Sequence, residues 1–126
     1  MRKRDPIKHI RDLAKSKYPA KVTCAICYSV ENLQLHHYNT LTLLLRKYSE
    51  TNSVDISTDE AVLDMRGSFI AAHHKELFED VVCLCKTCHN DKLHKIYGKV
   101  PSLGTAKKQP NWVKKMRDKH NAMAKN

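Results

Sequence analysis

The sequence predicts an α+β fold in which a zinc ion staples a small core and additional helices surround it. Two Cys-x-x-Cys pairs, Cys24/Cys27 and Cys85/Cys88, stand far apart in the chain, and four such thiolates are typical of a closed tetrahedral zinc site. Short apolar runs beside these pairs predict strands, while longer amphipathic stretches predict helices. With 126 residues, 41% of them hydrophobic, the chain is expected to form one modest core that benefits from a metal.

The zinc interpretation has an alternative, in which the cysteines are redox-active or simply buried thiols. Neither pair is followed by the pattern of a redox helix, so the structural zinc site is favoured. Structural zinc contributes roughly 10–16 kcal/mol to the folding of small zinc-binding peptides, which exceeds the stability of many domains of this size. The zinc is therefore expected to determine the fold, and the fifth cysteine, Cys83, is expected to point into the core.

Residues 1–21 predict a basic helix that packs on the core. Asp5 is a suitable N-cap, and Pro6 suits the first helical position. The helix is expected to end at Tyr18, because a residue that precedes a proline avoids helical geometry. Apolar residues at spacings of three and four mark its buried face: Ile7, Ile10, Leu13 and Ala14.

The expected core domain, residues 22–98, contains two short strands and a helix. Leu33 to Leu35 alternates like a half-buried strand and ends in His36-His37. A second apolar strand leads into the second cysteine pair, and a helix follows it. Gly98 suits the left-handed position just beyond the end of that helix.

A helical insert, residues 40–78, separates the two predicted strands. Its first helix is expected from Leu41 to Tyr48, and a polar loop follows at residues 49–57. Ser57 and Glu60 fit a capping box, in which each side chain satisfies a free amide at a helix start. The helix that they open is expected to run to about Leu77.

Positive charge is concentrated at the two ends of the chain, whose net charge is +10. Residues 1–22 contain eight Lys/Arg and two Asp, and residues 105–126 contain seven Lys/Arg and one Asp. Residues 99–126 predict a linker and then a basic helix or arm that Asn111 caps. Such arms usually bind polyanions, most often nucleic acid; the alternative is that they only keep the chain soluble.

The sequence gives no sign of a membrane or secretory segment. No apolar run approaches the roughly 18 residues that a membrane helix needs. The basic start, Met1 to Arg4, is followed by no apolar region of the kind that a secretory signal contains. Cysteines paired at metal-binding spacing suit a reducing compartment. A cytoplasmic protein without a membrane partner is therefore expected.

The histidines predict a second metal site beside the zinc site. His36 and His37 are successive residues of a strand and point to opposite sides, so one can bind a metal while the other faces a substrate. His89 follows the last zinc cysteine directly. A divalent ion between His36 and His89 would keep open coordination positions, as catalytic ions do. His9 and His120 are interpreted as ordinary structural histidines, and His73 as a core residue.

These motifs together resemble the HNH endonuclease superfamily in its zinc-knuckle form. The resemblance covers about residues 22–98 and rests on the cysteine pairs, on Leu35-His36-His37-Tyr38, and on the segment from Asp80 to His94. The end of that segment is similar to small bacteriophage and homing-type members. The resemblance implies a ββα-metal (His-Me finger) fold. It also implies a phage-encoded, metal-dependent DNA endonuclease that acts in the cytoplasm of a bacterial host as a monomer or homodimer.

The resemblance also implies roles for individual residues. His37 falls on the general base, and His36 and His89 fall on ligands of one catalytic ion, which would be Mg²⁺, Mn²⁺, Ni²⁺ or Zn²⁺. Asp80 falls where the family has an asparagine that orients the base. The enzyme would either nick one strand or cut both. Basic residues would hold the DNA backbone: Lys92, Lys95, Lys107, Lys108, Lys114, Lys115 and Arg117.

Two departures from the family pattern leave alternatives open. The second helix histidine of the family stands four residues after the first, but here Leu93 occupies that position and His94 comes one residue later. His89 and His94 can share an ion only if the helix is locally distorted; otherwise His94 contacts phosphate or caps the helix. Together with Asp80, this shift supports the alternative of a non-catalytic, zinc-containing DNA-binding or regulatory protein with an HNH-like fold.

Overall fold

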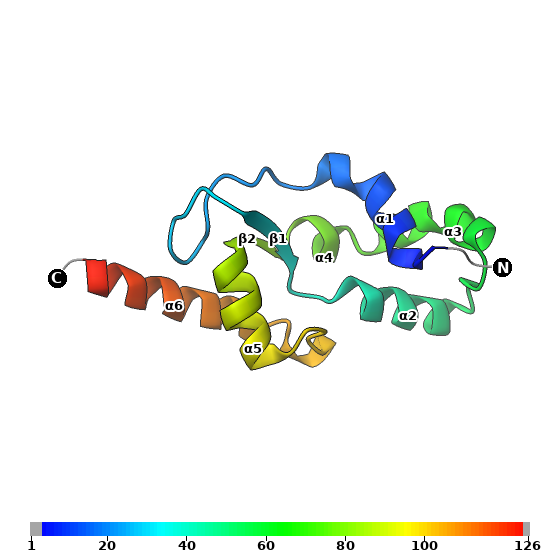
Figure 1. Cartoon of the computed structure of the whole chain (residues 1–126). Helices are drawn as coiled ribbons and strands as arrows, with labels where there is room; N and C mark the ends of the chain where they lie inside the picture. The colour runs from blue at the N-terminus through cyan, green and yellow to red at the C-terminus, as the bar shows by residue number, and fades with distance from the viewer. Residues whose placement is uncertain (1–3, 125–126) are drawn as a thin grey trace. The chain divides into compact units, whose positions relative to one another are not determined.

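The computed structural model describes residues 4–124, and its elements are drawn in Figure 1. The first three and last two residues of the predicted basic ends lie outside the described residues. The chain divides into two compact units. The helical unit comprises residues 1–19 and 41–80, and the strand unit comprises residues 20–40 and 81–126. Helices together with a two-stranded sheet give the predicted α+β class.

The helical unit begins with α1 (Pro6–Ala14) and a short 3-10 turn, η1 (Lys15–Lys17). The Asp5 carboxylate accepts a hydrogen bond from the Ile7 amide at 3.0 Å, which confirms the predicted cap. α1 packs against α3 (Asp59–Ala72). The core of this unit is made of aliphatic and aromatic side chains that the helices bury: Ile7, Ile10, Ala14, Leu41, Leu44, Leu45, Val62, Met65, Phe69 and Leu77.

The helical insert differs from its prediction at three boundaries. α2 (Leu41–Asn52) continues beyond Tyr48 through polar residues, because helices tolerate such residues on an exposed face, and it stops before Ser53, which has a φ of +52°. Thr58, not Ser57, caps α3 by accepting a hydrogen bond from the Ala61 amide at 3.1 Å. The Ser57 amide instead donates to Asp55 Oδ1 at 2.8 Å.

The third difference lies at the end of α3. The predicted helix to Leu77 breaks at His73, whose backbone (φ −119°, ψ 35°) is not helical. The short helix α4 (His74–Phe78) then completes the insert. The ring of His73 packs 5.2 Å from that of Phe69, and its Nδ1 lies 3.2 Å from Glu76 Oε2. His73 is therefore a half-buried residue at a helix junction, not a member of a continuous apolar face.

The strand unit contains one antiparallel sheet formed by β1 (Leu33–His37) and β2 (Val81–Cys85). In its register, Leu35 lies opposite Cys83 and His36 opposite Val82. Cys83 is only half-buried, so its predicted position in the core is wrong: the fully buried residue of this strand is Leu84, the neighbour on the opposite face.

Helices follow the sheet in the strand unit. The π-helix η2 (Thr87–Leu93) continues into α5 (His94–Tyr97), which ends at Gly98 with the predicted positive φ of +86°. After a 3-10 turn, η3 (Leu103–Thr105), the last helix α6 (Lys108–Ala124) begins three residues before the predicted Asn111 cap. Pro110 is tolerated there because the first turn of a helix needs no amide hydrogen bonds.

α6 is an integral part of the strand unit. Val113 is buried in the same hydrophobic cluster as Ile26, Tyr38, Leu84 and Leu93, and Trp112 and Met116 pack against that cluster. The predicted basic arm therefore has an apolar face that it uses within its own unit. Among the described residues, no helix is long and apolar enough to cross a membrane.

Candidate metal centres

Four cysteines converge in the strand unit. Their sulfur atoms all lie within 4.8 Å of one another, and Cys27 Sγ lies 3.7 Å from Cys85 Sγ. Two sulfurs bound tetrahedrally to one zinc ion at about 2.3 Å would stand about 3.8 Å apart. The donor set and its spacing therefore fit a structural zinc ion, held by Cys24, Cys27, Cys85 and Cys88.

Backbone hydrogen bonds fix the two turns that carry these cysteines. The Cys24 amide donates to the Ser29 carbonyl at 2.8 Å, and the Ala25 amide donates to the Cys83 carbonyl at 2.9 Å, which ties the first turn to β2. The Cys88 amide points at Cys85 Sγ from 3.5 Å. Burial favours the protonated form of Cys24, but amide hydrogens of Cys27, Cys85 and Ile26 outweigh it and lower the pKa of this thiol to about 7.

Three imidazoles form a second cluster in the same unit. His36 comes from β1, His89 from η2 and His94 from the start of α5, and one ring nitrogen of each lies within 4.8 Å of the others. His36 Nδ1 lies 2.9 Å from His89 Nε2, which in turn lies 2.9 Å from His94 Nε2. Nitrogens that share an ion at about 2.1 Å each cannot stand more than about 4.2 Å apart, and both pairs meet this condition.

The outward ring nitrogens of the three imidazoles all face oxygen acceptors. His36 Nε2 lies 2.6 Å from Gln109 Oε1, and His89 Nδ1 lies 2.7 Å from Gln34 Oε1. His94 Nδ1 lies 2.7 Å from the Gly98 carbonyl. An acceptor at each outer nitrogen holds the proton there and leaves the inner nitrogen with a free lone pair. Three lone pairs that face one another at these distances repel unless a cation lies between them.

The local helix geometry explains how His89 and His94 can point to one place. The His94 amide donates to the His89 carbonyl, which is the i to i+5 hydrogen bond of a π-helix. In an α-helix, residues five apart are rotated by about 140° from each other, whereas the wider π turn brings them to the same side. The structure thus contains the local distortion that a shared ion requires, and π turns often occur at functional sites.

Burial favours the neutral form of two of the clustered imidazoles, His36 and His89. Burial, reinforced by the positive charge that His36 and His94 would carry, lowers the pKa of His89 to about 4. Burial also lowers the pKa of His36, although its hydrogen bond to Gln109 opposes the shift. Neutral imidazole is the form that binds metal ions. His36 and His89 can therefore bind a cation at neutral pH without first losing protons.

The two predicted catalytic residues lie in different units. His37 follows His36 at the end of β1, is half-buried, and pairs with Val81 in the sheet. Asp80 belongs to the helical unit, where its two carboxylate oxygens lie 2.7 and 2.9 Å from Lys75 Nζ. The general base and its orienting carboxylate stay predictions.

All seven predicted DNA contacts lie in the strand unit, which also holds both clusters. Lys92 and Lys95 are exposed on η2 and α5, and Lys107, Lys108, Lys114 and Lys115 are exposed at or near the start of α6. Arg117 is half-buried, with Nε 3.9 Å from Asp118 Oδ1.

Sequence reasoning missed the two glutamines that orient the histidines. Gln34 lies on β1, two residues before His36, and Gln109 lies on α6. The sequence gives a weak indication that Gln34 could contact the histidines, because Gln34 shares a strand face with His36. It gives no such indication for Gln109, since Gln109 is far from every motif in the sequence.

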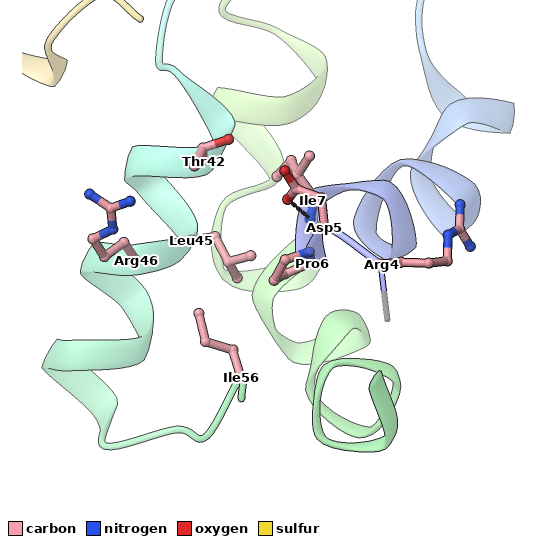
Figure 2. Close-up of a pocket in the computed structure, with 8 residues that line it drawn as sticks. All are labelled: Arg4, Asp5, Pro6, Ile7, Thr42, Leu45, Arg46 and Ile56. Atoms are coloured by element: carbon pink, nitrogen blue, oxygen red, sulfur yellow. Dashed lines mark hydrogen bonds between the residues drawn. The ribbon is translucent and has the colours of Figure 1, made fainter. Parts of the chain in front are cut away.

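The helical unit has a cavity of about 400 Å³, and none of the clustered cysteines and histidines lines it. It is lined by Leu45, Ile56 and the start of α1, and Figure 2 shows that Arg4 and Arg46 extend away from it. The Arg4 guanidinium lies 2.9 Å from Asp12 Oδ2. The two groups of side chains that could hold a metal ion among the described residues therefore lie in the strand unit and not at this cavity.

A family model described as a nicking endonuclease family, named for phage T5, matches residues 1–125 and so includes both units. No solved structure matches the chain significantly.

Proposed function

Because the chain belongs to the nicking endonuclease family, we propose that it is a metal-dependent DNA endonuclease of the HNH type that cuts one strand. The family match supports a phage DNA endonuclease. The HNH type and the ββα-metal fold rest on the motif resemblance and on the order of β1, β2 and the helix η2–α5 in the strand unit. We further propose that this nuclease acts in the cytoplasm of the bacterial host.

The observation that carries the proposal is the convergence of His36, His89 and His94 with an oxygen acceptor behind each ring. Three imidazole nitrogens provide fewer ligands than a divalent ion accepts, so positions stay available for phosphate and water. A divalent ion bound there would supply Lewis-acid stabilisation of the negative charge that develops on the phosphodiester. The cysteine cluster would hold a zinc ion with a structural role only.

His37 is the proposed general base. It stands next to the ligand His36 on an alternating strand, and its side chain is accessible enough to meet water. Neutral His37 takes a proton from the attacking water while the resulting nucleophile approaches phosphorus in line with the leaving oxygen. Asp80, which directly precedes β2, is proposed to orient His37 and to stabilise the imidazolium that forms. Exposed lysines of the strand unit hold the DNA backbone.

The proposal is tested on supercoiled plasmid DNA with Mg²⁺, Mn²⁺ or Ni²⁺, by measuring the rate at which the nicked form appears. His37→Ala is expected to lower this rate by roughly 10²–10⁴-fold, which is the usual contribution of a general base, and to leave zinc content unchanged. His74→Ala removes an exposed histidine of the helical unit and is expected to nick like the wild type.

Two outcomes contradict the proposal in different ways. If His37→Ala nicks DNA as fast as the wild type, the assignment of the base is wrong. If the wild type cuts no DNA with any of the three ions, while it still binds DNA, the non-catalytic DNA-binding alternative is correct.

Asp80→Asn restores the residue type that the HNH family has at this position and is expected to keep activity.

A further inference from the structure

One side chain from α6 reaches the histidine cluster from a distant part of the sequence. Gln109 has no exposed surface, although it carries a polar amide. Its Oε1 lies 2.6 Å from His36 Nε2, and its Nε2 donates to the Tyr38 carbonyl at 3.2 Å and to Thr105 Oγ1 at 2.9 Å. Both donor hydrogens of this amide and one acceptor position of its oxygen are thus used within the strand unit.

The orientation of this amide is fixed by chemistry. The Tyr38 carbonyl can only accept a hydrogen bond, so the group of Gln109 that faces it must be the NH₂ donor. The carbonyl oxygen of Gln109 must then face His36 Nε2, which must carry a proton in order to donate to it. His36 Nδ1 is consequently the unprotonated nitrogen, and it is the atom that faces His89.

The other two imidazoles are oriented from within the motif itself. His89 faces Gln34 on β1, and His94 faces the Gly98 carbonyl at the end of its own helix. His36 is the exception, because its acceptor comes from α6, beyond the segment that resembles HNH enzymes. The apolar face of α6 holds Gln109 in place, since Val113, one helical turn later, is buried in the core of the strand unit.

We propose that Gln109 is a positioning residue for the candidate catalytic ion, and that α6 is therefore a component of the metal centre as well as a basic surface. Gln109 selects the tautomer of His36 that can bind the ion and holds its ring. This inference rests on the proposed function, because it takes the three-histidine cluster to be a divalent-ion site.

The test compares two variants of zinc-loaded full-length protein. Gln109→Leu removes the acceptor and is expected to weaken Mn²⁺ binding by 10–100-fold, the usual effect of losing such a partner, as measured by isothermal titration calorimetry. Gln109→Glu keeps an oxygen toward His36 and is expected to bind Mn²⁺ at least tenfold more tightly than Gln109→Leu does. His89→Ala shows that the calorimetric signal arises from the histidine cluster, and Asn111→Ala is the control on the exposed face of α6.

A second measurement needs neither a metal nor activity. Imidazole ¹⁵N chemical shifts in protein without Mn²⁺ are expected to show His36 protonated at Nε2 in the wild type and in Gln109→Glu, and a mixture of tautomers in Gln109→Leu.

A third measurement tests whether Gln109→Leu is folded. Excess Mn²⁺ is expected to restore nicking by this variant, which it would not do for a misfolded protein.

The results separate this inference from the proposal on which it rests. A wild type that binds no Mn²⁺ overturns the metal site itself. Wild-type binding together with unchanged affinity and an unchanged His36 tautomer in Gln109→Leu overturns the role of Gln109 only.

Discussion

At the scale of single residues, the histidine cluster is defined by where its protons sit. An isolated buried imidazole can hold its proton on either nitrogen, but His36, His89 and His94 each meet an oxygen on the outer side only. The inner nitrogens are therefore acceptors, and protonating any of them would place a positive charge among its neighbours. For His89 this effect adds to the larger effect of burial, and together they lower its pKa.

The protonation of His89 predicts how stability depends on pH. Its pKa is about 4 in the folded protein and about 6.5 in an unfolded chain, so the unfolded chain binds the extra proton between these values. Stability contributed by neutral His89 is fully present above about pH 6.5 and is lost as the pH falls toward 4. Without added divalent ions, the melting temperature of the wild type should fall more steeply over this range than that of His89→Gln.

The comparison with His89→Gln removes the effects of other titrating groups, including the cysteines, because both proteins share them. A constant difference between the two melting temperatures from pH 7.5 to pH 4.5 would show that His89 is not held neutral by the fold.

The residues of the candidate site were predictable to different degrees. The four cysteines and His36, His89 and His94 could be selected from the sequence because each stands at a motif spacing, and the structure brings both groups together. Gln109 could not be selected. A glutamine acquires this role only when tertiary packing buries it against an imidazole, and no local pattern encodes that contact.

At the scale of elements, the residue that caps a helix is predictable where no neighbouring side chain competes for that role. Asp5 was identified correctly because Pro6 marks the first turn of α1 without ambiguity. At α3 two adjacent hydroxyl residues compete, and Thr58 prevails because Asp55 captures the Ser57 amide in a turn. Similarly, the break at His73 depends on ring packing with Phe69 and Tyr48, which helical periodicity does not reveal.

The cap of α3 gives a prediction about stability. Thr58→Ala removes the acceptor for the Ala61 amide and is expected to lower the free energy of unfolding by about 1 kcal/mol. Ser57→Ala is the matched control, because Ser57 is exposed and does not cap the helix; its effect should stay within about 0.5 kcal/mol. Urea denaturation followed by circular dichroism measures both. A larger loss of unfolding free energy in Ser57→Ala than in Thr58→Ala would show that Ser57 caps the helix, as the predicted capping box requires.

At the scale of the whole molecule, the cysteine cluster is expected to decide whether the strand unit folds. Cys85→Ser removes one zinc ligand and should lower the zinc content from one ion per chain to nearly none, with loss of the circular dichroism signal from the helices of this unit. Structural zinc contributes roughly 10–16 kcal/mol in small peptides, so other contacts cannot replace it.

Cys83→Ser is the control for this experiment, since Cys83 is the one cysteine outside the cluster. Cys83 is half-buried, and the Cys83→Ser protein should keep its zinc ion. Elemental analysis of both purified variants makes the comparison, and a zinc-free wild type that is fully folded would contradict the structural role of the metal.

The basic surface of the strand unit predicts a strong dependence of DNA binding on salt. If six to eight phosphates are neutralised, the log–log slope of affinity against salt concentration should be roughly −5 to −7. Replacing Lys114, Lys115 and Arg117 by Gln should make this slope shallower by about 3. Lys47→Gln, an exposed lysine of α2, should leave it unchanged. Fluorescence anisotropy with labelled duplex DNA over a range of NaCl concentrations provides the slopes.

The π-helix η2 affects which spacing of helical histidines a sequence pattern must allow. A residue added to an ordinary helix would rotate everything after it by about 100° and carry a ligand away from its ion. Here the wider turn absorbs the extra residue, so that His94 stays beside His89. A sequence pattern that fixes a four-residue interval between helical histidines will therefore overlook chains whose histidines converge as these do, and a pattern that allows five residues should recover them.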